Sequence, residues 1–495
     1  MCAWPTTGLP STCIDPPPGV QGMETLIMSV PLSPQCASRL TAHGQGHLLR
    51  CLAGAGPDYA ESLESLDPAL LASLFKGEGL ASPPDLTSLE PPPVVPAGAN
   101  AAARAAGERA LRAGQVAVVL VAGGQGTRLG SDQPKGCFPV GPVSGATLYQ
   151  IHAEKVLALG RKHGKTPVFL IMTSSATDAA TRDFFSEHGH FGLNPADVWF
   201  FRQGEMPAVD RQTGRILLEA PGKLFTAPDG HGGCLAALSR QGWLDKLAAR
   251  GVSDLFYFQV DNPLVAIADP VFIGHHILKG SQASSKVILR RDPSEKLGVF
   301  ARSRGRCHIV EYSDLPAAMG TATAADGSLL FGAGNPAIHL FSVPFLTRAA
   351  AGDSLMPYHA AVKKVPFWME ECGHVKPGTE NALKFEKFMF DVLPHADPWL
   401  LVETPREDEF APLKNAQGAD SPQEVRAALS RLAARWLAAA GIRVPVDPAG
   451  HPAAPLEISP LAALEPNDLN PERLRRTDWS IPLLVGPDGN WKEPR

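Results

Sequence analysis

The stretch VAVVLVAGGQGTRLG at residues 116–130, followed by PKG at residues 134–136, organises the interpretation of the whole chain. Residues 116–122 are an apolar run rich in valine, which is typical of a buried strand in a parallel sheet. Glycine then recurs four times within eight positions, at Gly123, Gly124, Gly126 and Gly130. Glycine permits positive φ angles and lacks the Cβ that would keep a ligand away from the backbone. Because backbone N–H groups exposed at a strand end form an anion cradle, this loop suits a polyphosphate.

Two familiar phosphate loops are excluded by the spacing. A Walker A loop requires Gly-Lys followed by Ser or Thr, which does not occur here. A dinucleotide fingerprint counted from Gly124 would place its third glycine at Leu129. A plain tight turn after a strand is the remaining alternative. The positive charges of Arg128 and Lys135 beside the glycines favour the phosphate interpretation over that turn.

Composition sets the outer limits. The chain has 495 residues, which corresponds to two or three domains. A net charge of -5 gives no support for a nucleic-acid surface, and no apolar run approaches the ~20 residues of a membrane span. The eight cysteines form no Cys-x-x-Cys pair, so neither a zinc site nor a disulfide framework is indicated. We therefore expect reduced thiols and a cytoplasmic protein.

Helical and strand patterns alternate after the glycine loop. The patterns predict helices over 147–164, 177–189 and 231–251, and strands over 166–173, 198–203 and 254–260. Such alternation predicts an α/β fold with a doubly wound, mostly parallel sheet. Ligands of these sheets bind at the carboxyl ends of the strands, where both the glycine loop and Asp261 fall.

Asp261 follows an aromatic strand as part of Asp-Asn-Pro. A carboxylate at a strand end can hold Mg²⁺ (or Mn²⁺) against phosphate oxygens. The more common use of Asp-Asn-Pro is to cap a turn or helix. A phosphate cradle at the same edge of the sheet favours the metal interpretation.

The sequence AGGQGTRLG at 122–130, with PKG at 134–136, resembles the nucleotide loop of the eukaryotic-type UDP-sugar pyrophosphorylases, most closely those that use N-acetylglucosamine. The resemblance covers roughly residues 100 to 490. A second match is REDEFAPLKN at 406–415, whose charges alone indicate only a solvated loop. The resemblance implies a nucleotide-diphospho-sugar transferase fold of the Rossmann-like type.

The resemblance assigns roles to individual residues. Arg128 and Lys135 would bind the leaving phosphates, Lys384 the UTP phosphates and Lys414 the sugar phosphate. Lys384 and Lys387 are neighbours only if 382–391 is helical, and a solvated lysine face is the alternative. The remaining nucleotide contacts would be Gly123, Gly124, Gln203, Gly230 and Asp261, with Asp261 also at the metal.

The same resemblance places His231, Gly298, Glu311, Tyr312 and Asn335 at the sugar. As isolated residues, each is more often a turn or a satisfied sheet position. His231 stands where the N-acetylglucosamine enzymes carry asparagine, in the loop APDGHGG at 227–233. Relatives that use glucose 1-phosphate or several sugars carry histidine in a similar context. The preferred sugar therefore stays open.

The implied reaction joins UTP and a sugar 1-phosphate to give a UDP-sugar and pyrophosphate. We expect N-acetylglucosamine 1-phosphate as substrate, with glucose or galactose 1-phosphate as the first alternative. A UDP-sugar binder that has lost catalysis is the second alternative. The sequence fixes neither the oligomeric state nor the metal.

The predicted domain plan has four parts. Residues 1–34 are expected to be disordered or to precede the true start, with Met28 as an alternative first residue. Residues 35–112 would form a helical N-terminal region, 113–400 the catalytic nucleotidyltransferase domain and 401–495 a C-terminal region.

Overall fold

The computed structural model describes residues 32–493, except residues 54, 83, 353–354 and 477. Most of the stretch predicted to be disordered or mis-assigned, residues 1–31 of 1–34, lies outside the described residues. The described chain divides into two compact units. The smaller comprises residues 32–82, 204–233 and 356–388, and the larger comprises the rest. The four-part domain plan drawn from the sequence stays a prediction.

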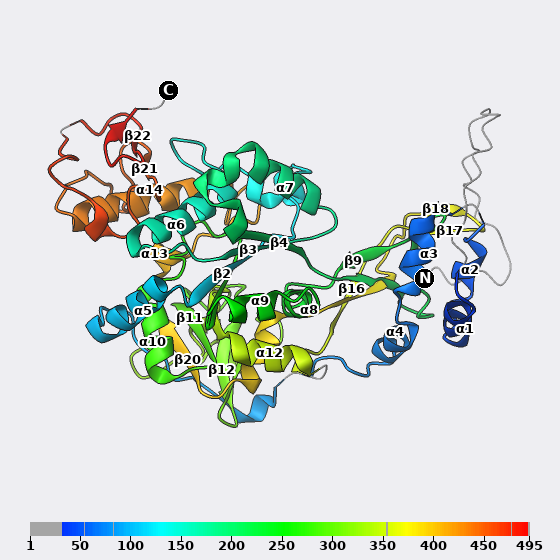
Figure 1. Ribbon diagram of the computed structural model, residues 1–495. Helices are drawn as coiled ribbons and strands as arrows, with labels where there is room; N and C mark the ends of the chain where they lie inside the picture. The colour runs from blue at the N-terminus through cyan, green and yellow to red at the C-terminus, as the bar shows by residue number, and fades with distance from the viewer. Residues whose placement is uncertain (1–31, 54, 83, 353–354, 477, 494–495) are drawn as a thin grey trace. The chain divides into compact units, whose positions relative to one another are not determined.

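The larger unit is built on a mixed sheet whose central strands are parallel (Figure 1). The parallel strands are hydrogen-bonded in the order β10, β2, β3, β4. Their bounds are Asp254–Gln259 for β10, Val116–Val121 for β2, Phe169–Thr173 for β3 and Val198–Arg202 for β4. These strands confirm the three predicted strands and the apolar run at 116–122. β2, β3 and β10 are buried along nearly their whole length and need an unbroken apolar sequence, whereas β4, at the end of the sheet, is only partly buried.

The sheet continues from β10 through antiparallel strands. β15 pairs antiparallel with both β10 and β11, and β20 pairs parallel with β11. The remaining members are β14, β12, β13 and β1. These strands span His339–Ser342 (β15), Ala283–Leu289 (β11), Trp399–Glu403 (β20), Ala333–Gly334 (β14), Val299–Ser303 (β12), Arg306–Val310 (β13) and Leu89–Glu90 (β1).

Helices cover both faces of the parallel strands. Figure 1 shows α6 and α7 on one side of β2, β3 and β4, and α9 and α12 on the other. The α-helices of this unit are α5 (Ala101–Ala113), α6 (Leu148–His163), α7 (Asp178–Glu187), α8 (Gly233–Arg240, all but its first residue), α9 (Trp243–Ala249), α10 (Pro270–Lys279), α11 (Ala317–Gly320), α12 (Val343–Ala351), α13 (Arg406–Glu409) and α14 (Pro422–Ala439). The predicted α/β, doubly wound and mostly parallel architecture is confirmed.

Local signals explain where the confirmed helices begin and end. The Thr147 side chain accepts a hydrogen bond from the Gln150 N–H and caps the start of α6. Gly164 ends the same helix in the left-handed conformation, at φ 80°.

The single helix predicted over 231–251 was wrong. The chain forms α8 (Gly233–Arg240) and α9, with Gly242 between them at φ 69°. A left-handed residue cannot continue a right-handed helix, so the helix stops and a second one starts.

The C-terminal part of the larger unit has its own small core. Helix α14 packs beside a short sheet of β21 (Leu456–Ile458), β22 (Leu483–Val485) and β23 (Trp491–Lys492). Its buried residues include Leu437, Leu456 and Leu483, each less than 2% exposed.

The smaller unit combines N-terminal helices with strands from two distant segments. One apolar cluster joins Leu63 and Leu74 of the helices to Val209 and Phe385 of the strands. The helices are α1 (Pro34–Ala42), α2 (His47–Arg50), α3 (Pro57–Glu64) and α4 (Pro68–Phe75). The strands are β5 (Glu205–Pro207), β6 (Val209–Asp210), β7 (Leu218–Ala220), β8 (Lys223–Leu224), β9 (Thr226–Pro228), β16 (His359–Lys363), β17 (Phe367–Met369), β18 (Gly373–Val375) and β19 (Ala382–Glu386).

Within the described residues, no helix has both the length and the apolar character needed to cross a lipid bilayer.

Helices α5 and α10 cross in backbone contact, which two glycines permit. A Cβ at Gly107 would lie 1.9 Å from the Pro270 carbonyl oxygen, and one at Gly274 would lie 1.7 Å from that of Ala103.

We expect Gly107→Ala or Gly274→Ala to lower the free energy of unfolding by about 1–3 kcal/mol, because the backbone atoms that the new Cβ meets cannot move aside as a side chain can. Denaturant unfolding measures the loss. Gly378→Ala, where a Cβ meets nothing within 4 Å, is the control and should change stability by less than ~0.5 kcal/mol.

Candidate active site

The glycine loop after β2 is closed by its own backbone. The Gly126 N–H donates to the Gln133 carbonyl at 2.9 Å, and the Lys135 N–H donates to the Gly124 carbonyl at 3.0 Å. Ser174 Oγ donates to the Gly123 carbonyl at 2.8 Å and anchors the loop to the end of β3. Space stays open beside Gly124, where a Cβ would meet no atom within 4 Å. The loop is therefore shaped without filling the space that a phosphate would need.

Three loop residues named from the sequence take distinct positions. Arg128 is exposed on the short turn Thr127–Leu129. Lys135 is largely buried, with 19% of its side chain exposed. Gly136 is needed for packing, because a Cβ there would lie 2.2 Å from the buried ring of Tyr149 in α6.

Gln203 lies against the first glycine of the loop. It follows β4 directly, and its N–H donates to the Thr173 carbonyl at 2.9 Å. A Cβ on Gly123 would lie 3.1 Å from Gln203 Oε1 and 3.3 Å from Nε2. The amide thus lies beside the glycine loop, where it can offer a donor and an acceptor to a base.

Asp261 and Lys135 meet at the carboxyl edge of the sheet. Lys135 Nζ lies 3.6 Å from Asp261 Oδ2, and 14% of the Asp261 side chain is exposed. In the part of the chain that the structure describes, no group of three or more His, Cys, Asp or Glu could hold a metal. Mg²⁺ that binds phosphate oxygens needs only one or two protein carboxylates, so Asp261 fits that use.

A buried amide ties the 406–415 stretch to this edge. Asn262 Nδ2 donates to the Glu409 carbonyl at 2.7 Å, and its Oδ1 accepts from the Ala411 N–H at 3.1 Å. The Leu413 N–H donates to the Asp261 carbonyl at 2.8 Å. These bonds place Lys414, whose side chain is 42% exposed, one residue beyond a direct contact with Asp261.

Three of the four predicted sugar contacts in the larger unit lie together. The Asn335 N–H donates to the Gly298 carbonyl at 2.9 Å, and a Cβ at Gly298 would lie 3.4 Å from Glu311 Oε1. Asn335 Oδ1 accepts from the Ala337 N–H at 2.9 Å, which fixes its amide. Tyr312 is 48% exposed on the turn that follows.

Gly230, His231 and Lys384 belong to the smaller unit. Gly230 has a φ of 83°, and a Cβ there would lie 2.4 Å from the Lys387 carbonyl oxygen. His231 stacks on Phe388, with 5.2 Å between ring centroids and 16° between the planes. Burial, and then the electrostatic effect of the neighbouring His359, lower the pKa of His231 to about 4, so its ring is neutral near pH 7.

The helical option for residues 382–391 was wrong. Residues Ala382–Glu386 form β19, which pairs with β16 and β6, and a 3-10 helix follows over Met389–His395. Lys384 Nζ lies 5.2 Å from the centroid of the Phe225 ring, and burial lowers the pKa of Lys384. Lys384 and Lys387 are therefore not neighbours on a helix face, because successive side chains in a strand alternate.

Two structural residues of the site went unassigned in the sequence. Asn262 was read only as part of Asp-Asn-Pro, although its amide holds the 406–415 stretch. Ser174, which anchors Gly123, carries no motif of its own. Ser174 directly follows β3 and Asn262 comes three residues after the end of β10, so a position shortly after a strand end is a usable signal for both.

Residues 94–423 match the sequence family described as UTP–glucose-1-phosphate uridylyltransferase (UDPGP). The chain belongs to this family. It is 38% identical over 493 residues to UDP-N-acetylhexosamine pyrophosphorylase-like protein 1 of Homo sapiens, covering 91% of this chain and 96% of that one. It is 40% identical over 344 residues to UDP-N-acetylglucosamine pyrophosphorylase of Saccharomyces cerevisiae, covering 68% and 72% of the two chains.

One solved structure with a similar fold is that of a protein from Trypanosoma brucei. The uridine diphosphate N-acetylglucosamine pyrophosphorylase in complex with inhibitor superposes with a TM-score of 0.75 at 28% identity. The match covers 89% of this chain and 94% of that one. Both the sequence family and the fold assigned from the glycine loop are confirmed.

A substitution of Asn262 tests how the 406–415 stretch is held at the carboxyl edge of the sheet. Asn262→Ala removes the partner of the Glu409 carbonyl and of the Ala411 N–H, so the 406–415 stretch should open locally. We expect faster amide hydrogen exchange there, by roughly tenfold or more for a loss of about 1–3 kcal/mol. Exchange in α5 and α10 should not change. Equal protection of 406–415 in the variant and the natural chain would contradict this account.

Proposed function

We propose that this chain transfers the uridylyl group of UTP to N-acetylglucosamine 1-phosphate, which gives UDP-N-acetylglucosamine and pyrophosphate. A phosphate oxygen of the sugar 1-phosphate attacks the α-phosphorus of UTP, and the bond to the β-phosphate breaks. The nucleophile is already anionic near neutral pH, so no general base is required. Family membership and the relatives named above support this reaction.

One observation carries the proposal: Lys135, Asp261 and the segment that holds Lys414 share one edge of the sheet. Lys135 Nζ is 3.6 Å from Asp261 Oδ2, and the Leu413 N–H bonds the Asp261 carbonyl. We assign Arg128 and Lys135 to the leaving phosphates and Lys414 to the sugar phosphate. Lys384 is assigned to the UTP phosphates.

The main obstacle to this reaction is electrostatic. Two unit charges ~4 Å apart repel by about 4 kcal/mol at an effective dielectric of ~20. Fixed cations and preorganised backbone donors offset that repulsion and stabilise charge that develops on the leaving pyrophosphate. The shaped loop at 123–136 supplies such donors without reorganisation during the reaction.

We propose Asp261 as the protein ligand of Mg²⁺ (or Mn²⁺). When bound, the cation would neutralise phosphate charge. The 3.6 Å between Lys135 Nζ and Asp261 Oδ2 supports a site that offers a cation and a carboxylate side by side to a metal-bound phosphate. The Leu413 N–H bonds the Asp261 carbonyl, and the Asn262 side chain fixes the 406–415 stretch beside it, so both hold Asp261 in place for that role.

The remaining assignments follow the same reasoning. Gly123, Gly124, Gln203 and Gly230 are proposed as nucleotide contacts, and Gln203 is supported by its approach to Gly123. The proposed sugar contacts are His231, Gly298, Glu311, Tyr312 and Asn335. We also propose a cytoplasmic location, which is supported by a cysteine spacing that indicates reduced thiols.

His231 favours one second candidate, the same transfer to glucose or galactose 1-phosphate. Its neutral, stacked ring has one donor and one acceptor nitrogen, which suit a hydroxyl as well as an acetamido group. A binder without catalysis is disfavoured, because Arg128, Lys135, Asp261, Lys384 and Lys414 are all retained.

Lys135→Ala should reduce turnover by more than about tenfold with the fold intact, because a charge that stabilises the leaving phosphates is lost. Pyrophosphate release from UTP and N-acetylglucosamine 1-phosphate measures the rate, and circular dichroism checks folding. Lys279→Ala, on the exposed end of α10, is the matched control and should keep full activity. An unchanged rate in Lys135→Ala would remove this residue from the mechanism.

The same assay on the natural chain tests the alternative of a UDP-sugar binder without catalysis. Pyrophosphate release no faster than background, together with measurable UTP binding, would favour that alternative.

The variant His231→Asn tests which sugar 1-phosphate the chain prefers. We expect the ratio of kcat/KM for N-acetylglucosamine 1-phosphate over glucose 1-phosphate to rise in the variant, by roughly 10–200-fold if one substrate contact decides it. Because the pKa of His231 is lowered to about 4, the shape of the pH–rate profile between about pH 5.5 and 8 should stay the same. A panel that includes galactose 1-phosphate makes the measurement. Loss of an acidic limb near pH 6.5 in the variant would contradict the neutral ring.

A further inference from the structure

A cavity of about 770 Å³ lies within the larger unit, apart from the proposed nucleotide and sugar contacts. None of the residues assigned to the reaction lines it. Its walls come from α6, α10, α14, the 263–267 stretch and the C-terminal region. Apolar side chains form much of the lining, among them Ile151, Leu159, Phe272, Leu432 and Trp436. A cavity of this size and character accommodates a small organic molecule.

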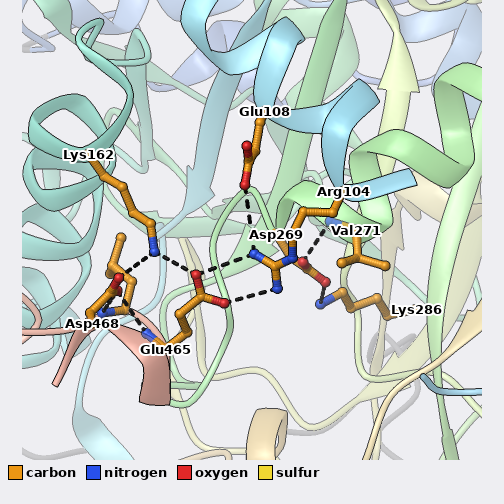
Figure 2. A network of polar contacts seen from close by, with 9 residues as sticks. Arg104, Glu108, Lys162, Asp269, Val271, Lys286, Glu465 and Asp468 are labelled. Atoms are coloured by element: carbon orange, nitrogen blue, oxygen red, sulfur yellow. Dashed lines mark hydrogen bonds and ion pairs between the residues drawn. The ribbon is translucent and has the colours of Figure 1, made fainter. Parts of the chain in front are cut away.

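Three lysines line the cavity, and two of them are neutralised by carboxylates. Lys162 Nζ donates to Glu465 Oε1 and to Asp468 Oδ1, both at 2.6 Å (Figure 2). Lys286 Nζ donates to Asp269 Oδ2 at 3.0 Å and to Glu409 Oε1. Figure 2 shows Lys162 and Lys286 each turned toward acidic side chains. Such partners raise the pKa of both amines, so both stay protonated and unreactive.

Lys155 differs from these two in the chemistry of its partners. Its Nζ donates to two backbone carbonyls, that of Pro263 at 2.5 Å and that of Val265 at 2.8 Å. Among the described residues, no ion pair joins Lys155 to a carboxylate, and Glu409, whose charge acts on Lys155, bonds Lys286 instead. A neutral amine has two N–H groups, which match the two carbonyls, whereas an ammonium would have a third.

Burial lowers the pKa of Lys155 to about 7, although the charge of Glu409 opposes the shift. Near pH 7 a substantial fraction of this lysine therefore carries the neutral, nucleophilic amine, in a wall between Ile151 and Leu159 on the same helix face.

We propose that this cavity is a second ligand site for small, mostly apolar aldehydes, with Lys155 as the residue that they modify. Lys155 Nζ attacks the carbonyl carbon, and a C–N bond forms. The carbonyl oxygen then leaves as water with the two amine hydrogens, and an imine remains. The step is reversible and needs no oxidant or reductant.

Modification would act on the proposed active-site edge, a consequence that rests on the proposed function. An imine nitrogen carries at most one N–H, so the Pro263 or the Val265 carbonyl must lose its donor. These carbonyls lie two and four residues beyond Asp261, on the turn that Asn262 also holds. Lys155 is thus a positioning residue for that turn, and its modification should slow uridylyl transfer.

The labelling experiment uses salicylaldehyde with the full chain near pH 7, followed by sodium cyanoborohydride, which reduces an imine to a stable secondary amine. Peptide mass mapping then compares the lysines. We expect labelling of Lys155 to exceed that of Lys162 and Lys286 by more than tenfold. Labelling of Lys155 no greater than that of these two lysines would overturn the proposal. No UTP is present, so a failure of the proposed function leaves this result readable.

Two alanines on α14 supply a matched pair that avoids altering Lys155. Ala439 is exposed and lines the cavity, whereas its exposed neighbour Ala438 does not. Ala439→Trp should reduce labelling of Lys155 several-fold by filling part of the cavity, and Ala438→Trp should leave it unchanged. Equal labelling in both variants would show that the aldehyde does not use this cavity and would overturn the proposal.

A third measurement tests whether modification of Lys155 slows uridylyl transfer. Protein labelled at Lys155 carries a secondary amine, which has one N–H when neutral and a bulky substituent, so one of the two carbonyls still lacks a donor. It should release pyrophosphate at least severalfold more slowly than protein treated with cyanoborohydride alone. Full activity of the labelled protein would overturn the link to the Asp261 turn while the labelling result stands by itself. Lys155→Met should show no label on this peptide and should lower turnover in the same direction.

Discussion

The parallel pairing of β10 with β2 is the constraint on which the rest of the site depends. Gln259 stands opposite Val121 in that pairing, and the Val260 N–H donates to the Val121 carbonyl at 3.0 Å. The next residues along the two strands are therefore level, which puts Asp261 beside the start of the glycine loop. Lys135 then returns to the same edge, because its N–H bonds the Gly124 carbonyl. A carboxylate, an ammonium and open backbone thus share one edge of the sheet.

Charges behind this edge are compensated before any substrate arrives. Glu409 accepts hydrogen bonds from Lys286, from Thr404 Oγ1 and from the Ala266 N–H, while its own carbonyl accepts from Asn262. A buried carboxylate without such partners would be strongly destabilising. The 406–415 stretch is consequently fixed at Glu409 and at Leu413, and Lys414 is presented from a held backbone. Positioning at this edge comes from hydrogen bonds between segments more than 100 residues apart.

Glycine performs two different tasks in this chain. Beside Gly124 the absent side chain leaves room for a ligand, whereas at Gly107, Gly136 and Gly274 it permits close packing. The motif PKG illustrates the difference, because Lys135 faces Asp261 while Gly136 fits under the Tyr149 ring. A glycine in a functional motif therefore need not contact the ligand.

The sequence by itself determined the α/β class, the parallel strands and the candidate residues at their ends, since these depend on local apolar periodicity and on turn residues. It also carried the family resemblance. It did not determine the break at Gly242 or the strand at 382–386, where glycine conformation and pairing with β16 and β6 prevailed over local pattern. Only the tertiary structure decided that Asn262 holds the 406–415 stretch and that Lys155 faces carbonyls while Lys162 and Lys286 face carboxylates. The physical reason is that burial and long-range partners fix the charge and position of a polar side chain, and neither is encoded in its immediate neighbours.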